Sequence, residues 1–301
     1  MYIVNHRKIF FILSFISILG SIGVMFMYGL NFGIDFKGGS LLEVSYESVR
    51  PPLESTKADL DTLDLGSYVL TPVGDLNYVL KARDITPSEK TEILKVFSKS
   101  ASAQGSGEMK EESFSSIGPV VGNQLKNKAF VAIVLVIICI VLFITFAFRK
   151  VSHPVASWKY GLAVIVALVH DVVIPTGVFV FWVRFQGGEI DLLFVTALLA
   201  ILGYSVHDTI VVFDRVRENL KVGISKESFT ETVGKSVTQT FGRSINTSLT
   251  IFLALAALYF LGGESTRDFA FVLLIGIITG TYSSIFVASP LLVTLEKLQK
   301  K

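Results

Sequence analysis

The stretch Ser205-Val206-His207-Asp208-Thr209-Ile210-Val211-Val212-Phe213-Asp214-Arg215-Val216-Arg217-Glu218 carries a carboxylate, Asp208, into an apolar run that begins near Asp191. If this run crosses a bilayer, the carboxylate costs about 2.5–3.5 kcal/mol on insertion scales. Ionisable residues inside membrane spans usually mark proton relays or ion pathways. Because no metal-ligand cluster or nucleophile motif accompanies Asp208 in the sequence, we expect it to take part in moving protons or ions.

The composition is that of an integral membrane protein. Of 301 residues, 51% are hydrophobic and 17% are charged, whereas soluble domains carry about 25% charged residues. The net charge of +2 is too small to indicate nucleic-acid binding, so no nucleic-acid partner is expected. Cys139 is the single cysteine, which excludes an intrachain disulfide, a CxxC motif or a cysteine-based zinc site. We expect no metal and no cofactor.

Six apolar runs are each close to the roughly 20 residues that a bilayer requires. They cover Ile9–Leu30, Ala129–Phe148, Ser157–Val183, Ile190–Phe213, Ile245–Leu261 and Phe269–Leu295. The first run is too long for a signal peptide and lacks a small-x-small cleavage site before Gly29, so it reads as a signal anchor. The expected organisation is residues 1–30 as the N-terminus and first span, then an external domain at 31–128. Residues 129–301 would form the remaining spans, with a cytoplasmic loop at 214–243.

Lysine and arginine residues near the spans predict the orientation, because cytoplasmic loops carry an excess of them. The basic residues on one side are Arg7, Lys8, Arg149, Lys150, Lys159, Arg215, Arg217, Lys221, Lys226, Lys235, Arg243, Lys297, Lys300 and Lys301. The short loops on the other side hold only Arg184 and Arg267. Both termini are therefore expected in the cytoplasm, and residues 31–128 outside it, next to a lipid bilayer that surrounds the spans.

Residues 31–128 alternate between strand-like and helix-like patterns. The expected strands are Ser40–Tyr46, Ser67–Val73, Asn77–Arg83 and Glu111–Ser116, and the expected helices are Leu53–Leu63 and Pro87–Lys99. Thr86, Pro87 and Glu89 form a capping box at the start of the second helix. The order β-α-β-β-α-β indicates an α+β domain of the ferredoxin-like, split βαβ kind. Without a catalytic constellation, a binding or docking domain is favoured over an enzyme.

The glycine-rich segment Gly33-Ile34-Asp35-Phe36-Lys37-Gly38-Gly39-Ser40 follows the first span. A phosphate-binding loop would need a following helix and a GK[ST] ending, and both are missing from this sequence. A tight turn that leads into the first strand is favoured instead.

Depth counting along the spans suggests a partner for Asp208. Asp208 lies about eighteen residues from the outer end of span four near Ile190, and Arg243 lies about nineteen residues from the outer end of span five near Gly262. At about 1.5 Å per residue, the two side chains sit at similar depth in the inner half of the membrane. Opposite charges at one depth invite pairing, which reduces the burial cost of each.

Further polar and small residues fall on helical stripes, spaced i, i+3, i+4 and i+7. The stripe in span five is Arg243, Asn246, Thr247 and Thr250, the one in span four is Ser205, Asp208 and Thr209, and the small-residue stripe in span six is Gly276, Thr279, Gly280 and Ser283. The span-six stripe predicts close helix packing. In span three, His170 and Asp171 lie midway between Trp158 and Trp182, close to the bilayer centre.

Structural explanations compete with functional ones at several positions. Asp208 and Arg243 could form an ion pair that only locks two helices together. Asp171 could hydrogen-bond at a kink near Pro175. His170 and His207 are the kind of residue that is more often a satisfied core residue than a proton carrier.

The motifs, taken together, resemble those of a known family. Gly33-Ile34-Asp35-Phe36-Lys37-Gly38-Gly39 resembles the opening motif of the SecD/SecF family of protein-export membrane proteins. The SecF branch is resembled by three further segments: His170-Asp171-Val172, Asp208-Thr209-Ile210-Val211-Val212-Phe213-Asp214-Arg215-Val216-Arg217-Glu218-Asn219, and Arg243-Ser244-Ile245-Asn246-Thr247-Ser248. The match covers nearly the whole chain, and the length favours a stand-alone SecF-type chain. His207 departs from the family, in which asparagine is expected.

The resemblance implies half of an RND-type transporter, with six transmembrane helices and an external domain between spans one and two. It implies a multi-pass protein of the bacterial cytoplasmic (inner) membrane that is not an enzyme. Implied partners are SecD, the SecYEG channel, YajC, YidC and a translocating unfolded polypeptide. The proton-motive force would promote late steps of translocation. By resemblance, Asp208 is the proton-responsive carboxylate, Arg243 is its coupled partner, and Asp171 is a second candidate.

Two other functions stay open on the sequence. A proton-coupled half-transporter for small-molecule efflux would share the fold and the proton site, although the external domain is small for a drug-binding funnel. A structural scaffold would use the charged residues only to hold helices together. An intramembrane protease is disfavoured, because the sequence contains no GxSxG or HExxH motif.

Overall fold

The computed structural model describes residues 2–149, 155–221 and 228–299. The predicted inner-side residues Lys150, Lys226, Lys300 and Lys301 lie outside the described residues. The chain divides into two compact units, one formed by Met1–Asn31 with Phe130–Lys301 and the other by Phe32–Ala129. The external domain expected at 31–128 differs from the second unit by one residue at each end.

In the part of the chain that the structure describes, six helical stretches are long and apolar enough to cross a membrane, as predicted. After the short α1 (Tyr2–Asn5), they are α2 (Arg7–Tyr28), α6 (Pro119–Ala147), α7 (Ser157–Gln186), α8 (Leu192–Lys221), α9 (Phe229–Leu261) and a last stretch made of α10 (Glu264–Tyr282), the π-helical η1 (Ser283–Ala288) and α11 (Ser289–Gln299).

The segment expected as a cytoplasmic loop at 214–243 is helical for most of its length, because α8 continues to Lys221 and α9 begins at Phe229. Its place on the cytoplasmic side stays a prediction. A capping box between Ser228 and Glu231 starts α9. The Asn219 side-chain amide donates to Ser236 Oγ at 2.8 Å and to Gln239 Oε1 at 2.9 Å, which ties the two helix ends together. The charged ends of these helices thus extend the spans as a helical hairpin.

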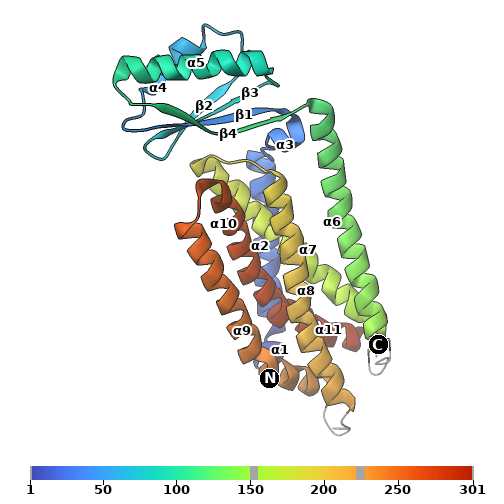
Figure 1. The fold of residues 1–301 in the computed structure, drawn as a ribbon. Coiled ribbons are helices and arrows are strands. Elements are labelled where there is room, and N and C mark those ends of the chain that lie inside the picture. Colours follow the sequence, from blue (N-terminus) through green and yellow to red (C-terminus); the bar gives the residue numbers. More distant parts are fainter. Residues whose placement is uncertain (1, 150–154, 222–227, 300–301) are drawn as a thin grey trace. The chain divides into compact units, whose positions relative to one another are not determined.

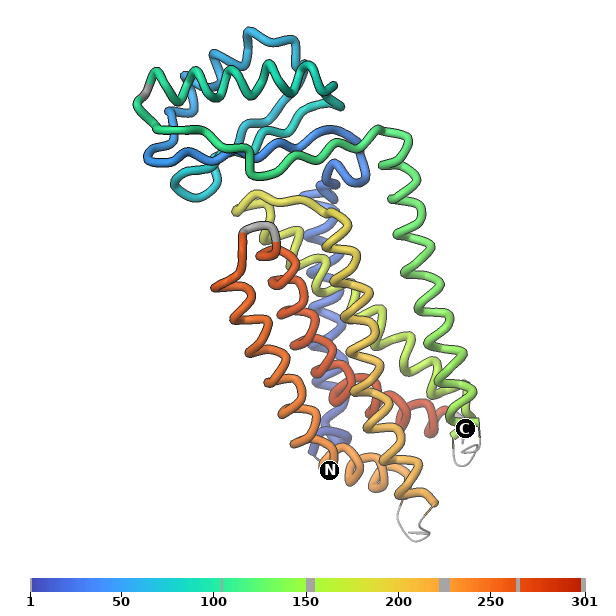
Figure 2. Tube along the Cα trace, in the orientation of Figure 1, coloured from blue at the N-terminus to red at the C-terminus, as the bar shows by residue number. Residues whose placement is uncertain are grey.

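Helix α10 is the centre of the helical unit, since it packs against α7, α8 and α9 (Figure 1). Helix α2 packs along α7, and the tube trace in Figure 2 shows these helices running side by side. Buried apolar residues from α7, α8, α9 and α11 make the core of the unit, among them Leu168, Val212, Val237 and Leu292. In contrast, only 6% of the apolar window of α6 is buried, as expected for a surface that faces lipid.

The second unit is an antiparallel sheet covered on one face by two helices (Figure 1). Its elements are β1 (Gly39–Tyr46), α4 (Leu53–Leu60), β2 (Val69–Val73), β3 (Asn77–Ala82), α5 (Pro87–Gln104) and β4 (Met109–Ile117). The predicted order β-α-β-β-α-β is confirmed, with element ends moved by a few residues. The strand order is β2-β3-β1-β4, so β3 separates β1 from β2. The name ferredoxin-like stays a prediction that this order supports.

Helix α5 begins as predicted. Thr86 Oγ1 accepts from the Glu89 amide at 3.4 Å, and Glu89 Oε2 accepts from the Thr86 amide at 2.7 Å, with Pro87 at the first helical position. The core lies between helices and sheet and includes Leu42, Val44 and Phe97, each at most 1% exposed.

The predicted turn before the first strand is correct, and it contains a short helix, α3 (Ile34–Lys37). Gly38 and Gly39 follow with φ of 81° and 131°, values that side chains disfavour. A Cβ atom at Gly38 would lie 2.7 Å from Pro119 Cα, and one at Gly39 would lie 2.7 Å from the Ala82 carbonyl oxygen. Glycine is therefore required at both positions. Asp35 lies in the first turn of α3, half-buried.

Candidate functional site

Asp208 is buried between α8 and α9, with 5% of its surface exposed. Ser244 Oγ, on α9, donates to Asp208 Oδ1 at 2.6 Å. Within residues 2–149, 155–221 and 228–299, Asp208 Oδ2 is buried and has no hydrogen-bond partner. A buried polar atom without a partner is costly, and such atoms in native structures call for an explanation. Asp208 therefore has one oxygen held and one oxygen open.

The predicted ion pair between Asp208 and Arg243 is not formed among the described residues. The Arg243 side chain is exposed on α9, and the neighbouring Ser244 is the residue that turns toward α8. Counting residues placed Arg243 at the depth of Asp208 but did not predict which side of α9 it occupies. Because each helical residue is rotated by about 100° from the one before, Ser244 faces α8 and Arg243 does not. Arg243 and His207 are nonetheless the charged or titratable groups nearest to Asp208 that could influence its charge.

The predicted polar stripe of span five lies on the outward face of α9. Arg243, Asn246 and Thr250 are exposed and Thr247 is half-buried. The face of α9 that turns inward carries Ser244 and Ser248 instead. Their i, i+4 spacing is visible in the sequence and could have identified them as a second stripe on the same helix.

Ser248 joins three helices. Its Oγ lies 2.7 Å from Tyr204 Oη of α8 and 2.6 Å from Thr281 Oγ1 of α10. It also donates to the Ser244 carbonyl oxygen at 2.7 Å, so this chain of hydroxyls continues directly to the residue that holds Asp208. Side-chain hydroxyls that bond across helices are a common means of association inside membranes.

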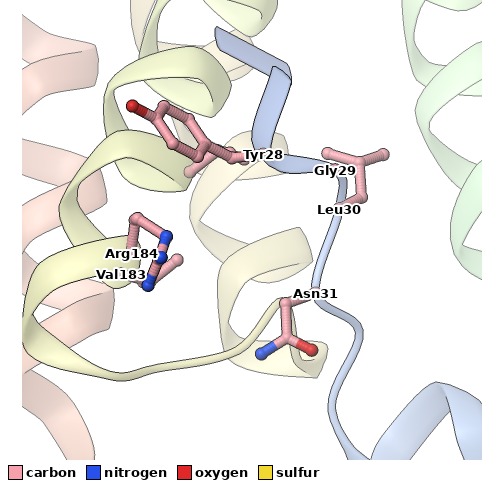
Figure 3. A pocket seen from close by; sticks show the side chains of 7 residues that line it. Tyr28, Gly29, Leu30, Asn31, Val183 and Arg184 are labelled. Atoms are coloured by element: carbon pink, nitrogen blue, oxygen red, sulfur yellow. The ribbon is translucent and has the colours of Figure 1, made fainter. Parts of the chain in front are cut away.

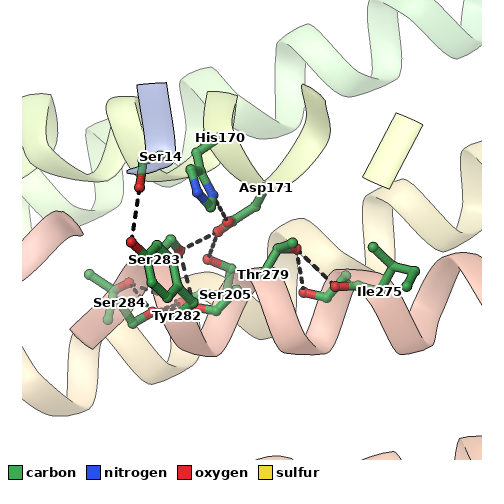
Figure 4. A network of polar contacts seen from close by, with 12 residues as sticks. Ser14, His170, Asp171, Ser205, Ile275, Thr279, Tyr282, Ser283 and Ser284 are labelled. Atoms are coloured by element: carbon green, nitrogen blue, oxygen red, sulfur yellow. Dashed lines mark hydrogen bonds and ion pairs between the residues drawn. The ribbon is translucent and has the colours of Figure 1, made fainter. Parts of the chain in front are cut away.

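Asp171 occupies the centre of a second polar cluster (Figure 4). It is 0% exposed. Ser205 Oγ of α8 and Ser283 Oγ of η1 both donate to Asp171 Oδ2, the latter at 2.7 Å. His170 Nδ1 lies 2.8 Å from Asp171 Oδ1. Asp171 thus connects α7 with α8 and η1, rather than serving the Pro175 kink alone.

The neighbours of this cluster are also buried. Thr209 Oγ1 donates to the Ser205 carbonyl oxygen at 3.0 Å and lies 2.8 Å from Ser284 Oγ. The His170 ring stacks on Tyr282 with centroids 5.8 Å apart, and Tyr282 Oη donates to the Phe10 carbonyl oxygen of α2 at 3.1 Å. The cluster therefore reaches four membrane helices. His207 is exposed, on the side of α8 away from both clusters.

The small residues of span six allow α10 to approach α8 closely. A Cβ atom at Gly276 would overlap the Ile201 side chain, and one at Gly280 would lie 3.2 Å from Ser205 Cβ. These contacts have the character that the sequence predicted. Ser283 was expected only to pack, and the structure adds its hydrogen bond to Asp171.

A pocket of about 400 Å³ lies at the ends of α2 and α7, apart from both clusters (Figure 3). It is lined by Tyr28, Gly29, Leu30, Asn31, Val180, Val183 and Arg184. Arg184 stands in the last turn of α7, where a cation complements the negative end of the helix dipole. That role accounts for Arg184 without a ligand. Over the described ranges, no three His, Cys, Asp or Glu residues are grouped as metal ligands.

Comparisons with known proteins identify relatives across the chain. Residues 97–298 match the family described as protein export membrane protein SecD/SecF, C-terminal, and residues 23–48 match the SecD/SecF GG motif. A protein translocase subunit SecF from Thermobaculum terrenum is 40% identical, over 98% of this chain and 93% of the relative. One from Desulfurispirillum indicum is 38% identical, over 91% of this chain and 87% of the relative.

A solved structure agrees with these relatives. SecDF from Thermus thermophilus, described as a translocon-associated membrane protein, matches with a TM-score of 0.82 and 31% identity. The match covers 99% of this chain and 39% of the SecDF chain. A SecDF structure in a super-membrane-facing form matches with a TM-score of 0.65 over 98% of this chain.

Proposed function

Because the chain belongs to the SecD/SecF family of protein-export membrane proteins, we propose that it is an accessory subunit of the Sec protein translocase that couples proton movement to a late step of protein translocation. Asp208 is the group that takes up and releases the proton. The protein is a multi-pass membrane protein that acts as a transport subunit and not as an enzyme.

The open oxygen of Asp208 carries this proposal. A carboxylate inside a span costs about 2.5–3.5 kcal/mol on insertion scales, and a purely structural acidic residue would be expected to have both oxygens satisfied. Asp208 is 5% exposed, has one donor in Ser244, and keeps Oδ2 without a partner among the described residues. A proton can bind to Oδ2 without displacing an existing hydrogen bond.

Proton uptake by Asp208 changes what holds α8 against α9. The neutral acid loses its attraction to Arg243 and accepts the Ser244 hydrogen bond less strongly, since hydrogen bonds to charged groups are roughly twice as strong. The helices then repack, and the external domain shifts between polypeptide-holding and polypeptide-releasing states. The energy is sufficient, because one charge crossing 100 mV is worth about 2.3 kcal/mol.

The setting of this cycle is the bacterial cytoplasmic membrane. Both termini lie in the cytoplasm and the external domain lies on the opposite side. The charge distribution supports this orientation: most basic residues gather beside the spans on one side, whereas Arg184, in the last turn of α7, and Arg267, in the first turn of α10, lie at the other ends of the spans.

The outward polar face of α9 supports a partner inside the membrane. Arg243, Asn246 and Thr250 are exposed within an apolar span, and polar residues in a span almost always face protein or water rather than lipid. The SecDF structures contain a SecF-like region in one chain with further sequence. SecD is therefore the partner proposed for this face. The SecYEG channel, YajC, YidC and an unfolded polypeptide are the wider set of proposed partners.

Export of a secreted reporter in cells depleted of the native protein tests the proposal. Asp208→Asn should abolish the part of export that depends on the proton-motive force, because an amide cannot cycle between charged and neutral forms. Asp214→Asn is the matched control on the same helix, with a side chain 64% exposed and paired with Arg217 at 3.4 Å. It should export like the native chain.

Normal export by Asp208→Asn would reject proton coupling at this residue, and normal export by Arg243→Ala would remove Arg243 from the cycle. Unimpaired secretion with raised sensitivity to toxic compounds on deletion would instead indicate an efflux half-transporter. Loss of SecD association without any change in proton dependence would indicate a scaffold.

A further inference from the structure

We propose that Asp171 is a positioning residue, which fixes the turn of α8 that carries Asp208 and does not itself exchange protons. The two membrane carboxylates thus divide the work: Asp208 changes its charge, and Asp171 holds the element on which Asp208 stands. This inference rests on the proposed role of Asp208.

The first support is the difference in how the two carboxylates are occupied. Both oxygens of Asp171 are engaged: Oδ2 accepts from Ser205 and Ser283, and Oδ1 faces His170 Nδ1 at 2.8 Å. Asp208 has one donor and one open oxygen. Three contacts thus occupy most of the roughly four lone-pair sites of the Asp171 carboxylate, whereas a single contact occupies those of Asp208, so a proton has more room to bind at Asp208.

The second support is the mechanical link from Asp171 to Asp208. Ser205 lies three residues before Asp208, which is about one helical turn. Its hydroxyl is held by Asp171, and its carbonyl oxygen accepts from Thr209 Oγ1 at 3.0 Å and Ser284 Oγ at 3.2 Å. The turn of α8 that carries Asp208 is therefore held from α7 on one side and from η1 on the other.

The third support is the helix geometry at η1. Ser283 and Ser284 are consecutive, yet Ser283 reaches Asp171 of α7 and Ser284 reaches Ser205 of α8. They open the π-helical segment Ser283–Ala288. Such segments are rare in proteins overall, but those that occur frequently lie at functional sites. The hydrogen bond to Asp171 is thus donated by the first residue of this π-helical segment.

Few charged or titratable groups surround Asp171. On α7 it faces His170, and through the His170 ring it reaches Tyr282 of α10, whose hydroxyl lies 3.5 Å from Ser14 of α2. The groups from α8 and η1 are the hydroxyls of Ser205 and Ser283. Asp208 has His207 on its own helix and Arg243 on α9 as charged or titratable neighbours.

Carbodiimide labelling measures the two carboxylates separately. Dicyclohexylcarbodiimide reacts with protonated carboxyls inside membranes, and peptide mass spectrometry locates the adduct. With the complete protein in native membranes, we expect Asp208 to be labelled with a clear pH dependence and Asp171 to stay unlabelled. Asp171→Asn should displace the pH midpoint of Asp208 labelling by about one unit. This is the size expected when roughly one hydrogen bond that positions Asp208 is lost.

Ser283→Ala is a milder second variant that serves if Asp171→Asn misfolds, because it removes one hydrogen-bond donor and keeps the Asp171 carboxylate. It should displace the midpoint in the same direction by a smaller amount. Thr176→Val is the control, since Thr176 Oγ1 on α7 donates to the Val172 carbonyl oxygen of its own helix. It should leave the midpoint unchanged.

Labelling of Asp171 in parallel with Asp208 would overturn the inference, as would an unchanged midpoint in both Asp171→Asn and Ser283→Ala. Neither result would affect the proposed function, which fails only if Asp208→Asn supports normal proton-dependent export.

Discussion

The two compact units treat their polar groups in opposite ways. In the unit Phe32–Ala129, called the external unit after its proposed location, the ion pairs Arg83–Glu89 and Lys90–Glu111 lie at the surface, with side chains 24–45% exposed. In the helical unit, Asp171 and its serine donors are 0% exposed. A surface ion pair contributes little to stability and says little about function. A polar group inside a membrane span, in contrast, needs a hydrogen-bond partner within the protein. Polar changes should therefore alter function in the helical unit, and apolar changes should alter stability in the external one.

Phe97→Ala should have the largest effect on stability. Phe97 is 0% exposed in the core of the external unit, and truncating a buried phenylalanine costs about 3–5 kcal/mol. Hydrogen exchange on the full chain should show lost protection in residues 32–129 and unchanged protection in the membrane helices. Val49→Ala, at a side chain 63% exposed, is the control. Loss of protection in both units would break the distinction between them.

Gly276→Ala is the reciprocal change in the helical unit. The new Cβ would overlap Ile201, and overpacking of this kind costs about 1–3 kcal/mol. The thermal midpoint of the detergent-purified protein should fall, with the exchange change confined to α8 and α10. Gly203→Ala is the matched control, since nothing lies within 4 Å of a Cβ there. Equal loss of stability from both variants would contradict the tight α8–α10 contact.

Arg243→Gln should weaken binding of SecD while leaving the stability of the chain unchanged. We expect about five- to tenfold weaker association, or about 1–1.4 kcal/mol, measured by quantitative co-purification from membranes. Arg267→Gln is the control, because the Arg267 guanidinium lies 5.1 Å from the Tyr259 ring centroid within the same chain. Full retention of SecD by Arg243→Gln would contradict the assignment of the outward face of α9 to SecD.

The smallest effect is expected from pH at the surface of the external unit. Hydrogen bonds from Arg83 and from Thr86 hold the pKa of Glu89 at about 2, below its ordinary value. A depressed pKa stabilises the folded state above the unfolded pKa, about 4.3, and this stabilisation is lost as the pH falls from there through about 2. The protection factors of the first-turn amides of α5, which correct for the pH dependence of intrinsic exchange, should fall over that window.

Glu89→Gln should exchange faster at neutral pH and lose this acid dependence. Glu92→Gln, on the exposed side of the same helix and outside the capping box, should keep it. An identical acid response in native protein and Glu89→Gln would remove the capping box as its source.

Local signals in the sequence predicted much of the fold. The Thr86-Pro87-Glu89 pattern marked the start of α5, because a capping box is made by residues within one turn. Apolar runs predicted six spans because a bilayer imposes a length. The charged residues were expected to end the apolar spans at Phe213 and Ile245, whereas the helices continue past these points and are tied together by Asn219, Ser236 and Gln239.

The candidate site could be predicted only in part. Ser205, Asp208 and Thr209 of the span-four stripe and Asp171 of span three are all buried, whereas Ser244 and Ser248 of α9 were missed. The partner of Asp208 was missed because helix rotation depends on tertiary packing, which no residue count contains. Ser283 was expected only to pack because it belongs to a stripe of small residues, and its hydrogen bond to Asp171 depends on how η1 and α7 meet in three dimensions.

The paired glycines at the base of the external unit have a mechanical consequence. Gly38, where the chain arrives in this unit, touches Pro119, where the chain departs, so closely that no Cβ fits between them, and a Cβ at Gly122 would lie 2.8 Å from the Gly38 nitrogen. The points where the chain enters and leaves this unit are therefore in direct contact. A displacement of Pro119, at the start of α6, would therefore be passed directly to Gly38, one residue before β1. A bulkier residue at Gly38 would push the chain apart at Gly38 and Pro119, so that the two segments could move separately.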